Sequence, residues 1–223
     1  MRQYNDKTES LIPHSPPRFE ELLTAVSQSE FAASLDFGSA FWQCPLSESS
    51  RKFSVFAHRG VQYCWTRSFQ GDKNAPSAWS FCVQEALSQH NWIHFLQLKR
   101  RAGATDINGE EIGQDLNDLA IERALFLFVD DLFLHSNKKQ IYYLLLEFLF
   151  WACLSYNLKL DILKCRLLSK RIVFLGMDLN LSLRSYRLEP LRCQAFCNWQ
   201  FPWVSGSPSL SRKLLISRLC QVC

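Results

Sequence analysis

Residues 125–134 read LFLFVDDLFL, so two apolar runs meet at the adjacent acids Asp130 and Asp131. Apolar residues at every position of both runs predict a hairpin that is buried on each face. Two ionised carboxylates beside such a core are costly unless a cation offsets their charge. Mg²⁺ does this well, because it prefers carboxylate oxygens. An exposed turn, which Asp tolerates, is the competing interpretation, and this stretch alone weighs the two about equally.

A second acid favours the metal site. Asp36 follows a predicted strand that begins at Phe31. If the end of that strand lies beside the Asp-Asp hairpin, three carboxylates converge on one point. Such a constellation suits two metal ions roughly 3.5–4 Å apart, the arrangement that serves in-line phosphoryl transfer. Taken alone, Asp36 would more simply be a helix cap or a turn acid.

The remaining pattern predicts an α+β domain, with an antiparallel sheet backed by helices. Helices are predicted over residues 18–28, 74–90 and 138–156, the second with Pro76 near its first turn. Strands are predicted over residues 31–37, 53–57, 61–66, 124–129, 132–136 and 171–178. Residues 99–123 are polar and are expected to form an inserted loop.

Composition sets broader limits. With 223 residues and 48% hydrophobic content the chain can bury a core, and its net charge of +4 permits nucleic-acid binding without arguing strongly for it. The polar opening MRQYNDKTES predicts no signal peptide, and the longest apolar stretch, residues 141–154, is shorter than a membrane span. Scattered cysteines favour a reducing, intracellular compartment, most simply the cytoplasm, with a virus-like particle or the nucleus as alternatives. A zinc cluster of Cys193, Cys197, Cys220 and Cys223 is a minor alternative.

Several motifs then resemble those of retroviral and LTR-retrotransposon reverse transcriptases, in the same order. They are DFGSAFWQCPL at residues 36–46, WTRSFQGDKNAP at 65–76, FVDD at 128–131, LKL at 158–160 with Lys164-Cys165, and FLGM at 174–177. Arg2 and Asn5 match the start of the family's segment before the palm. The resemblance therefore covers nearly the whole chain and implies RNA-directed DNA polymerase chemistry from an endogenous retrovirus or LTR retrotransposon pol polyprotein.

The resemblance also implies roles for individual residues. Asp36 and Asp130 would be the principal ligands of two Mg²⁺ ions, with Mn²⁺ as an alternative metal, and Asp131 the third acid. Backbone N–H groups of Phe37, Gly38, Ser39 and Ala40 would cradle the triphosphate, and Phe41 would be the steric gate against ribonucleotides. Gln70 and Gly71 would pack beside the incoming nucleotide and the template base, and Lys164 would protonate pyrophosphate. Phe174, Leu175, Gly176 and Met177 would form the primer grip, a hairpin that steadies the primer terminus, although by themselves they would indicate a buried strand. Core packing for Phe41 and a solvated surface role for Lys164 are the simpler alternatives.

The implied partners are an RNA or DNA template with its primer and deoxynucleoside triphosphates, with no membrane. The implied division is a remnant before the palm and of the fingers (1–30), a reverse transcriptase palm (31–189) and a truncated start of the thumb (190–223). Phe128 replaces the usual Tyr, Asp72 stands where it could repel a triphosphate, and the polar insertion would enter near the nucleic-acid channel. A parent polyprotein is expected to carry a ribonuclease H. The alternatives are an inactive remnant that at most binds nucleic acid, and a plain metal-binding domain.

Overall fold

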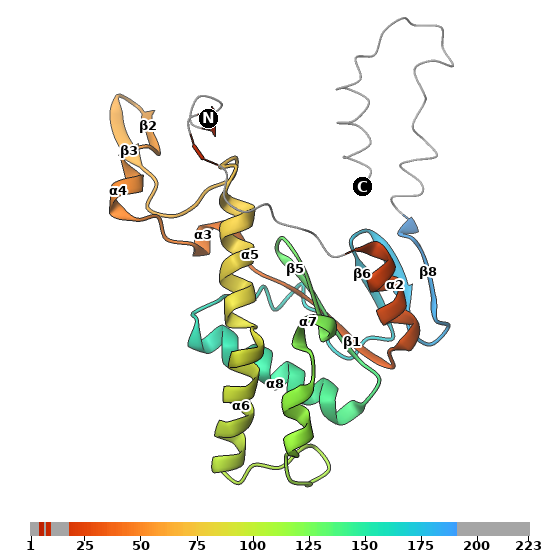
Figure 1. Cartoon of the computed structure of the whole chain (residues 1–223). Helices are drawn as coiled ribbons and strands as arrows, with labels where there is room; N and C mark the ends of the chain where they lie inside the picture. Colours follow the sequence, from red (N-terminus) through yellow and green to blue (C-terminus); the bar gives the residue numbers. More distant parts are fainter. Residues whose placement is uncertain (1–4, 7, 10–17, 191–223) are drawn as a thin grey trace, which may run out of the picture.

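The computed structural model describes residues 5, 6, 8, 9 and 18–190. Its helices are α2 (Phe19–Gln28), α3 (Ala40–Gln43), α4 (Glu48–Arg51), α5 (Ala75–Ala86), α6 (Gln89–Arg101), the 3₁₀ turn η1 (Gln114–Asp118), α7 (Ile121–Ala124) and α8 (Lys139–Ser155). Its strands are β1 (Phe31–Asp36), β2 (Val55–His58), β3 (Val61–Cys64), β4 (Leu125–Phe128), β5 (Asp131–Ser136), β6 (Arg171–Phe174), β7 (Met177–Asn180) and β8 (Ser185–Leu188). The predicted α+β class is confirmed (Figure 1).

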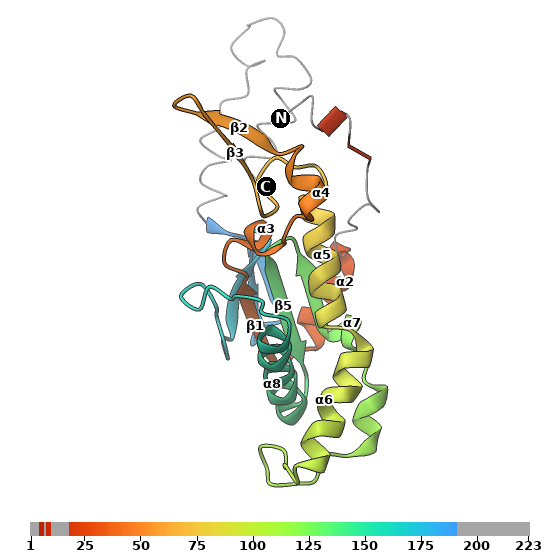
Figure 2. The same ribbon diagram turned by 90° about the vertical axis from the view of Figure 1, so that its left-hand side faces the viewer.

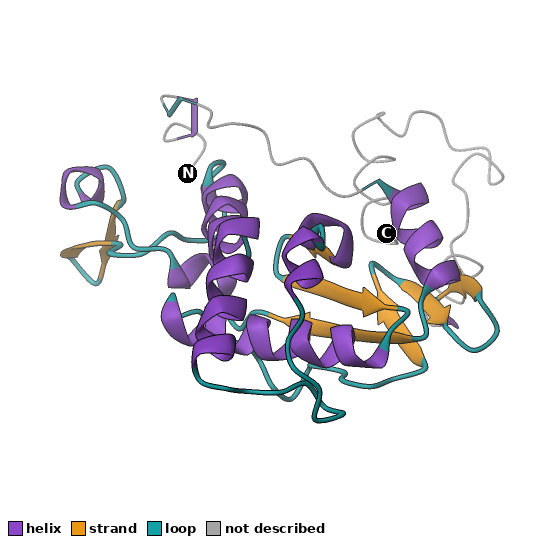
Figure 3. Ribbon diagram, turned by 60° about the horizontal axis from the view of Figure 1, so that its bottom comes forward, coloured by secondary structure: helices purple, strands orange, loops and turns teal. Residues whose placement is uncertain are grey.

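The strands form three antiparallel sheets, ordered β1-β5-β4, β2-β3 and β6-β7-β8. The first, which we call the central sheet, is covered on both faces. Leu132 and Leu134 face the core built with α5, α6 and α8, whereas Phe133 faces α2 and the β6-β7-β8 sheet. All three are fully buried, and each such side chain contributes roughly 1.5–3 kcal/mol. The double burial predicted from the apolar hairpin is therefore confirmed. Figure 3 shows the central sheet with helices around it.

The helix predicted over residues 74–90 is wrong in one respect, because two helices meet there. α5 ends at Ala86, and Ser88 begins α6 by accepting a hydrogen bond from the Asn91 N–H. The Asn91 side chain donates back to the Glu85 and Ala86 carbonyls, at 2.8 and 3.2 Å. These side-chain bonds satisfy the carbonyls that a helix end leaves unpaired.

The strand predicted over residues 171–178 is also wrong, because the chain reverses within it. β6 and β7 are joined by a two-residue turn at Leu175 and Gly176, whose φ angles are 51° and 75°. Positive φ at both central residues is the mark of a type I′ hairpin turn. β8 then pairs with β7.

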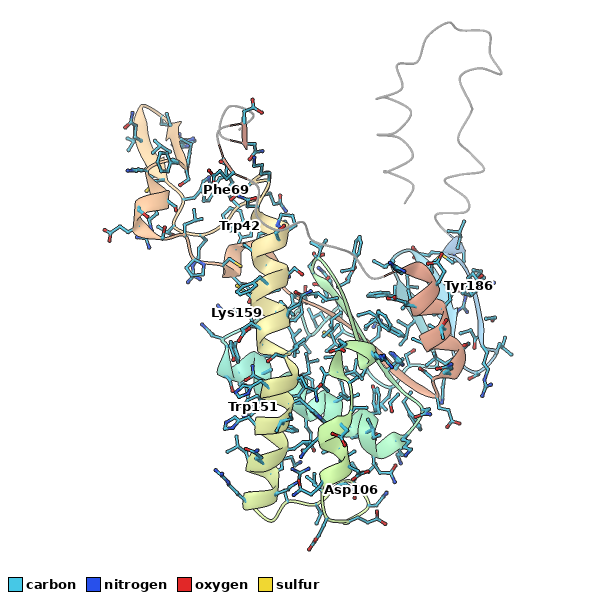
Figure 4. The ribbon with its side chains drawn as sticks, viewed as in Figure 1. Trp42, Phe69, Asp106, Trp151, Lys159 and Tyr186 are labelled. Carbon is cyan, nitrogen blue, oxygen red and sulfur yellow. The ribbon has the colours of Figure 1, made fainter. Side chains whose placement is uncertain are left out.

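The polar segment 99–123 is a packed element rather than a free loop. α6 runs on to Arg101, and Arg100 donates to the Ile112 and Gly113 carbonyls and to the Asn117 side chain. Asp106 marks its outer turn, at the end of the molecule opposite the β2–β3 hairpin (Figure 4). The Asp-Asp turn is bonded to α5, the helix that precedes α6, through Trp79.

The β2–β3 hairpin and α4 project from the rest of the fold as an arm (Figures 1 and 2). We call residues 47–67 the arm. No helix in the described part of the chain combines the length and apolar character needed to cross a membrane.

Candidate active site

The strand ends that carry the predicted acids lie together. In the pairing of β1 with β5, Asp36 is directly opposite Asp131. Asp130 occupies the two-residue turn between β4 and β5, together with Val129. The Asp130 carbonyl accepts a hydrogen bond from the Phe37 N–H at 2.8 Å, so the turn is bonded to the residue that follows β1. Asp131 is thus a strand residue, and only Asp130 lies in the turn.

The carboxylates interact strongly. Burial, reinforced by the negative charges of Asp130 and Asp36, raises the pKa of Asp131 to about 6, while Lys164 opposes the rise. The Lys164 ammonium lies 3.1 Å from Asp36 Oδ1 and 3.5 Å from Asp161 Oδ2. Its hydrogen bond to Asp36 raises the pKa of Lys164, which therefore stays protonated at neutral pH. One exposed ammonium faces several carboxylates, so this end of the sheet favours cations.

The donor chemistry fits a hard divalent cation. Two carboxylates from paired strands, with a third on the adjoining turn, offer the oxygens that Mg²⁺ and Mn²⁺ prefer. Within the described residues, however, no group of three or more His, Cys, Asp or Glu side chains lies close enough to hold a metal ion. The structure thus brings the three acids to one end of the sheet without gathering their side chains into a three-ligand cluster.

Trp79 supports the acidic turn. Its indole N–H donates to the Val129 carbonyl at 2.6 Å, and its ring packs edge-on against Phe37, with centroids 5.1 Å apart. Val129 has φ of 54°, a left-handed conformation that is strained for a β-branched residue. Sequence reasoning missed Trp79, because a fully buried Trp at helical spacing indicates only core packing.

Two of the four N–H groups predicted to cradle the triphosphate form hydrogen bonds within the protein. The Phe37 N–H is bonded to the acidic turn, and the Gly38 N–H donates to the Lys159 carbonyl at 3.0 Å. Both N–H groups are therefore engaged within the protein in this conformation, whereas the predicted cradle would use them as donors to the triphosphate. Ser39, with φ of 54°, and Ala40 follow them at the start of α3. Their N–H groups have no partner among the residues described.

Phe41 lies on α3 and is partly buried against the main core. The same short helix carries Gln43, whose side-chain amide donates to the Gly38 and Lys159 carbonyls and accepts from the Lys159 N–H. Lys159 is labelled in Figure 4 beside α8. These bonds fix the loop that follows Asp36 to the segment that follows α8.

Gln70 is exposed, and Gly71 adopts φ of 93° just before α5. The Asn5 side chain donates to the Gly71 carbonyl at 2.8 Å, which gives the N-terminal motif residue a structural role. The sequence suggested that the Asp72 carboxylate could repel a triphosphate. In the structure Asp72 is buried and accepts a hydrogen bond from the Asn74 N–H. Its charge therefore serves the start of α5.

The residues of the predicted primer grip form the β6–β7 turn. Phe174 is buried, with its ring centroid 5.3 Å from that of Phe133 on β5. Leu175 and Met177 are partly buried, and Gly176 completes the turn. Phe174 therefore anchors the hairpin to the strand that carries Asp131 rather than presenting its ring to a ligand.

A charge cluster holds the three strands beyond this turn. Asp178 on β7 is buried and accepts hydrogen bonds from Arg171 on β6 and Arg187 on β8, at 2.7 and 2.9 Å. These two guanidinium groups hold the pKa of Asp178 well below its usual range.

Two further basic residues, absent from the predicted site, lie beside the acids. A cavity of about 360 Å³ is lined by Asp36, Asp131, Lys164, Arg166 and Arg171, among others. The sequence signal was available, since KCRLLSKR at residues 164–171 is rich in cations. Basic side chains beside paired carboxylates can bind phosphates as well as balance charge.

Comparison with known proteins identifies the family. The model of the reverse transcriptase (RNA-dependent DNA polymerase) family matches residues 1–179. The chain belongs to this family. It is 24% identical over 167 residues to the enzymatic polyprotein of cauliflower mosaic virus (strain D/H), a match covering 75% of the chain and 20% of that polyprotein. It is 30% identical over 84 residues to the Pro-Pol polyprotein of simian foamy virus type 1, covering 38% of the chain and 7% of the relative.

Solved structures show the same fold. A foamy viral protease–reverse transcriptase in complex with an RNA/DNA hybrid matches with a TM-score of 0.63 at 21% identity, over 90% of this reverse transcriptase chain and 23% of that one. Another, in complex with double-stranded DNA, gives a TM-score of 0.67 at 20% identity, over 97% and 31%. The chain thus spans a minor part of the polyproteins that it matches. The predicted start of the thumb, residues 190–223, lies outside the described residues except for residue 190, and the alternative zinc cysteines lie wholly outside them.

Proposed function

We propose that this reverse transcriptase chain is the palm of an RNA-directed DNA polymerase that adds deoxynucleotides to a primer 3′-hydroxyl by two-metal nucleotidyl transfer. The observation that carries the proposal is the pairing of Asp36 with Asp131 at the end of the central sheet, with Asp130 in the adjoining turn. Family membership supports the reaction class, and the raised pKa of Asp131 supports a need for cations.

Asp36, Asp130 and Asp131 would hold two Mg²⁺ ions, with Mn²⁺ as the alternative. When bound, such ions supply Lewis acidity toward the primer hydroxyl and the triphosphate. Lys164, which forms an ion pair with Asp36, would give a proton to the departing pyrophosphate. The N–H groups of Ser39 and Ala40, which have no partner among the described residues, would contact the triphosphate. These roles combine the contacts above with the family resemblance.

The remaining site residues receive the roles that the resemblance implies. Phe41 would select deoxynucleotides, and Gln70 with Gly71 would pack beside the incoming nucleotide. The β6–β7 turn would steady the primer terminus, with Leu175 and Met177 at its surface and Phe174 as its anchor. Nucleic-acid complexes of the structural neighbours support a template–primer duplex as the partner.

We further propose that the chain derives from an endogenous retrovirus or LTR-retrotransposon pol polyprotein that also carries a ribonuclease H. Residues 1–30 would precede the palm, residues 31–189 would form it, and residues 190–223 would begin the thumb. The viral polyproteins among its relatives support this origin.

Primer extension on an RNA template tests the function. The unaltered chain should extend a labelled primer with Mg²⁺ or Mn²⁺, and Asp130→Asn should remove extension. Asp118→Asn, the same chemical change at an exposed acid of η1, is the matched control and should retain it. Equal activity in the unaltered chain and in Asp130→Asn would refute the proposed site.

A second candidate function is nucleic-acid binding by a catalytically inactive palm. It is favoured by the lack of a three-ligand cluster in the described residues, and by Lys164 bonding the carboxylate of Asp36. Template–primer binding without extension, equal in the unaltered chain and in Asp130→Asn, would support this alternative.

A further inference from the structure

Two cysteines meet where α3 packs against α5. Cys44 directly follows Gln43, the last residue of α3, and Cys82 lies on α5, one helical turn after Trp79. Both are free thiols, and they form a hydrogen bond with each other. Because the two residues are far apart in sequence, the contact depends on the packing of α3 against α5 (Figures 1 and 2). We call Cys44 and Cys82 the thiol pair.

The two thiols differ in their access to solvent. Cys44 is 7% exposed, and burial, reinforced by the neighbouring Cys82 thiol, raises the pKa of Cys44 to about 12. Cys82 is only partly buried. Both line a cavity of about 1020 Å³, with Trp42, Phe81 and Tyr156 among its walls. A small oxidant that enters this cavity therefore meets Cys82 as the more accessible sulfur, while Cys44 stays a protonated thiol beside it.

A second pair of cysteines shows what is particular to the first. Cys153 on α8 is also buried, and burial, together with the nearby Cys165, raises its pKa to about 12. The Cys165 thiol, however, donates its hydrogen bond to the Asp161 carbonyl at 3.3 Å. Its S–H is thus directed to the backbone rather than to Cys153. The second pair shares the burial of the thiol pair but lacks its thiol–thiol hydrogen bond, which makes it an internal comparison.

The thiol pair lies at the base of the arm. The Cys44 carbonyl accepts a hydrogen bond from the Ser68 N–H at 2.8 Å, and Pro45 forms an isolated β-bridge with Arg67. The chain therefore leaves for the arm and returns from it at the same place. A covalent bond between Cys44 and Cys82 would fix this base to α5, the helix that is bonded to the acidic turn.

We propose that Cys44 and Cys82 are an oxidation site, which closes to a disulfide when the chain meets hydrogen peroxide. The Cys82 thiolate attacks one peroxide oxygen and the O–O bond breaks, so that Cys82 becomes a sulfenic acid. The other oxygen leaves as hydroxide and takes up the proton that Cys82 released.

The second step forms the bridge. The Cys44 sulfur attacks the Cys82 sulfur, the S–O bond breaks, and the Cys44 proton leaves with the oxygen as water. The pair loses two electrons in all, and the peroxide gains them. Low-molecular-weight thiols reopen the bridge by exchange, as expected of a transient disulfide in a reducing compartment. None of these steps needs polymerase activity.

Cleavage within the arm gives a sharp test, because Cys44 is the only cysteine that precedes Cys64 in the sequence. Arg59 is exposed in the turn between β2 and β3, so brief trypsin treatment of the folded chain should cut there. The fragment before the cut then carries Cys44 alone. On a denaturing gel it stays attached to the remainder only if Cys44 has formed a disulfide. After hydrogen peroxide, we expect the fragments to migrate together without dithiothreitol and apart with it.

Matched variants identify the partner of Cys44. Cys82→Ser should abolish the link. Cys64→Ser, at the exposed cysteine of β3, and Cys153→Ser, at the other buried cysteine, should both retain it. Peptide mapping by mass spectrometry should find the bridge between Cys44 and Cys82 in the oxidised unaltered chain, so the test does not depend on whether a variant folds.

The order of the two steps can be measured separately with dimedone, which labels sulfenic acids. In Cys44→Ser the bridge cannot close, so peroxide should leave Cys82 as a sulfenic acid that dimedone labels. In Cys82→Ser dimedone should leave Cys44 unlabelled, because that thiol is buried and protonated.

Three results would overturn the proposal: fragments that separate after peroxide without any reductant, a mapped disulfide that joins Cys44 to a cysteine other than Cys82, or a link that persists in Cys82→Ser. The bridge forms within one chain, so the linked fraction should stay the same when the chain is diluted tenfold before oxidation. A linked fraction that falls on dilution would instead assign the disulfide to a contact between two chains and contradict the proposal.

Discussion

The hydrogen bond from Trp79 to the acidic turn gives the sharpest test of how the site is held. Trp79→Phe keeps a ring against Phe37 but removes the indole N–H that bonds the Val129 carbonyl. Leaving this partly buried carbonyl unpaired costs about 1–3 kcal/mol. The smaller ring leaves a cavity of roughly 40 Å³, which costs about 1 kcal/mol more. We therefore expect a loss of about 2–4 kcal/mol in the free energy of unfolding.

The chain offers a closely matched control. Trp92 is also fully buried, donates its indole N–H to a backbone carbonyl (Leu116, 2.8 Å), and packs edge-on against a Phe (Phe148, 5.3 Å). It lies on α6 and has no contact with the acidic turn. Trp92→Phe should therefore cost about the same stability, on the same physical grounds, without touching the site.

Urea unfolding measures the stability of both variants, and Mn²⁺ titration followed by electron paramagnetic resonance measures metal affinity. Only Trp79→Phe should lower Mn²⁺ affinity and primer extension, because only there is the strained φ of Val129 released. Equal effects of the two variants on Mn²⁺ affinity, at equal loss of stability, would refute a positioning role for Trp79.

Three other outcomes follow from the charges. The folded-state pKa of Asp178 is depressed, so its contribution to stability is present above about pH 4 and is lost as the pH falls. Asp178→Asn should therefore lower the melting temperature at pH 7 more than at pH 3. Burial lowers the pKa of His135, so the unaltered chain should lose stability as the pH falls below about 6.5, and His135→Gln should lose less over that interval in thermal melts. In EDTA the chain should keep its circular dichroism spectrum and cooperative melting, while primer extension stops. Added Mg²⁺ should raise the melting temperature. Unfolding in EDTA would contradict the expectation that the fold forms without metal.

Much of the central sheet could be predicted because its signal is local. Apolar residues at every position of residues 125–134 require burial on both faces, and the interrupting acids mark the place where that burial ends. The same reasoning placed Asp36 at a strand end, and the register opposite Asp131 confirms that the two ends are adjacent.

Other features depend on tertiary contacts that no local pattern encodes. The break between α5 and α6 is stabilised by Asn91 reaching back to carbonyls five and six residues earlier, and polar residues inside a helical pattern are common enough to hide it. The turn within residues 171–178 did carry a local signal in Gly176, but the apolar residues around it favoured a continuous strand. The use of the Phe37 and Gly38 N–H groups could not be foreseen, because their partners lie far away in sequence.

Hydrogen bonds to backbone carbonyls hold the strand ends of the site in place. The position of these strand ends therefore does not depend on the charge of the carboxylates. The Asp36 carbonyl accepts a hydrogen bond from the Asp161 N–H at 2.8 Å, and the Asp130 carbonyl accepts one from the Phe37 N–H. The Trp79 indole N–H donates to the Val129 carbonyl. None of these bonds requires a cation. The strand ends can therefore form on folding alone, and the crowded carboxylates are left with Lys164 as a close but exposed counterion. The backbone at the strand ends is therefore preorganised, and only the carboxylate side chains would have to gather for a cation to bind there.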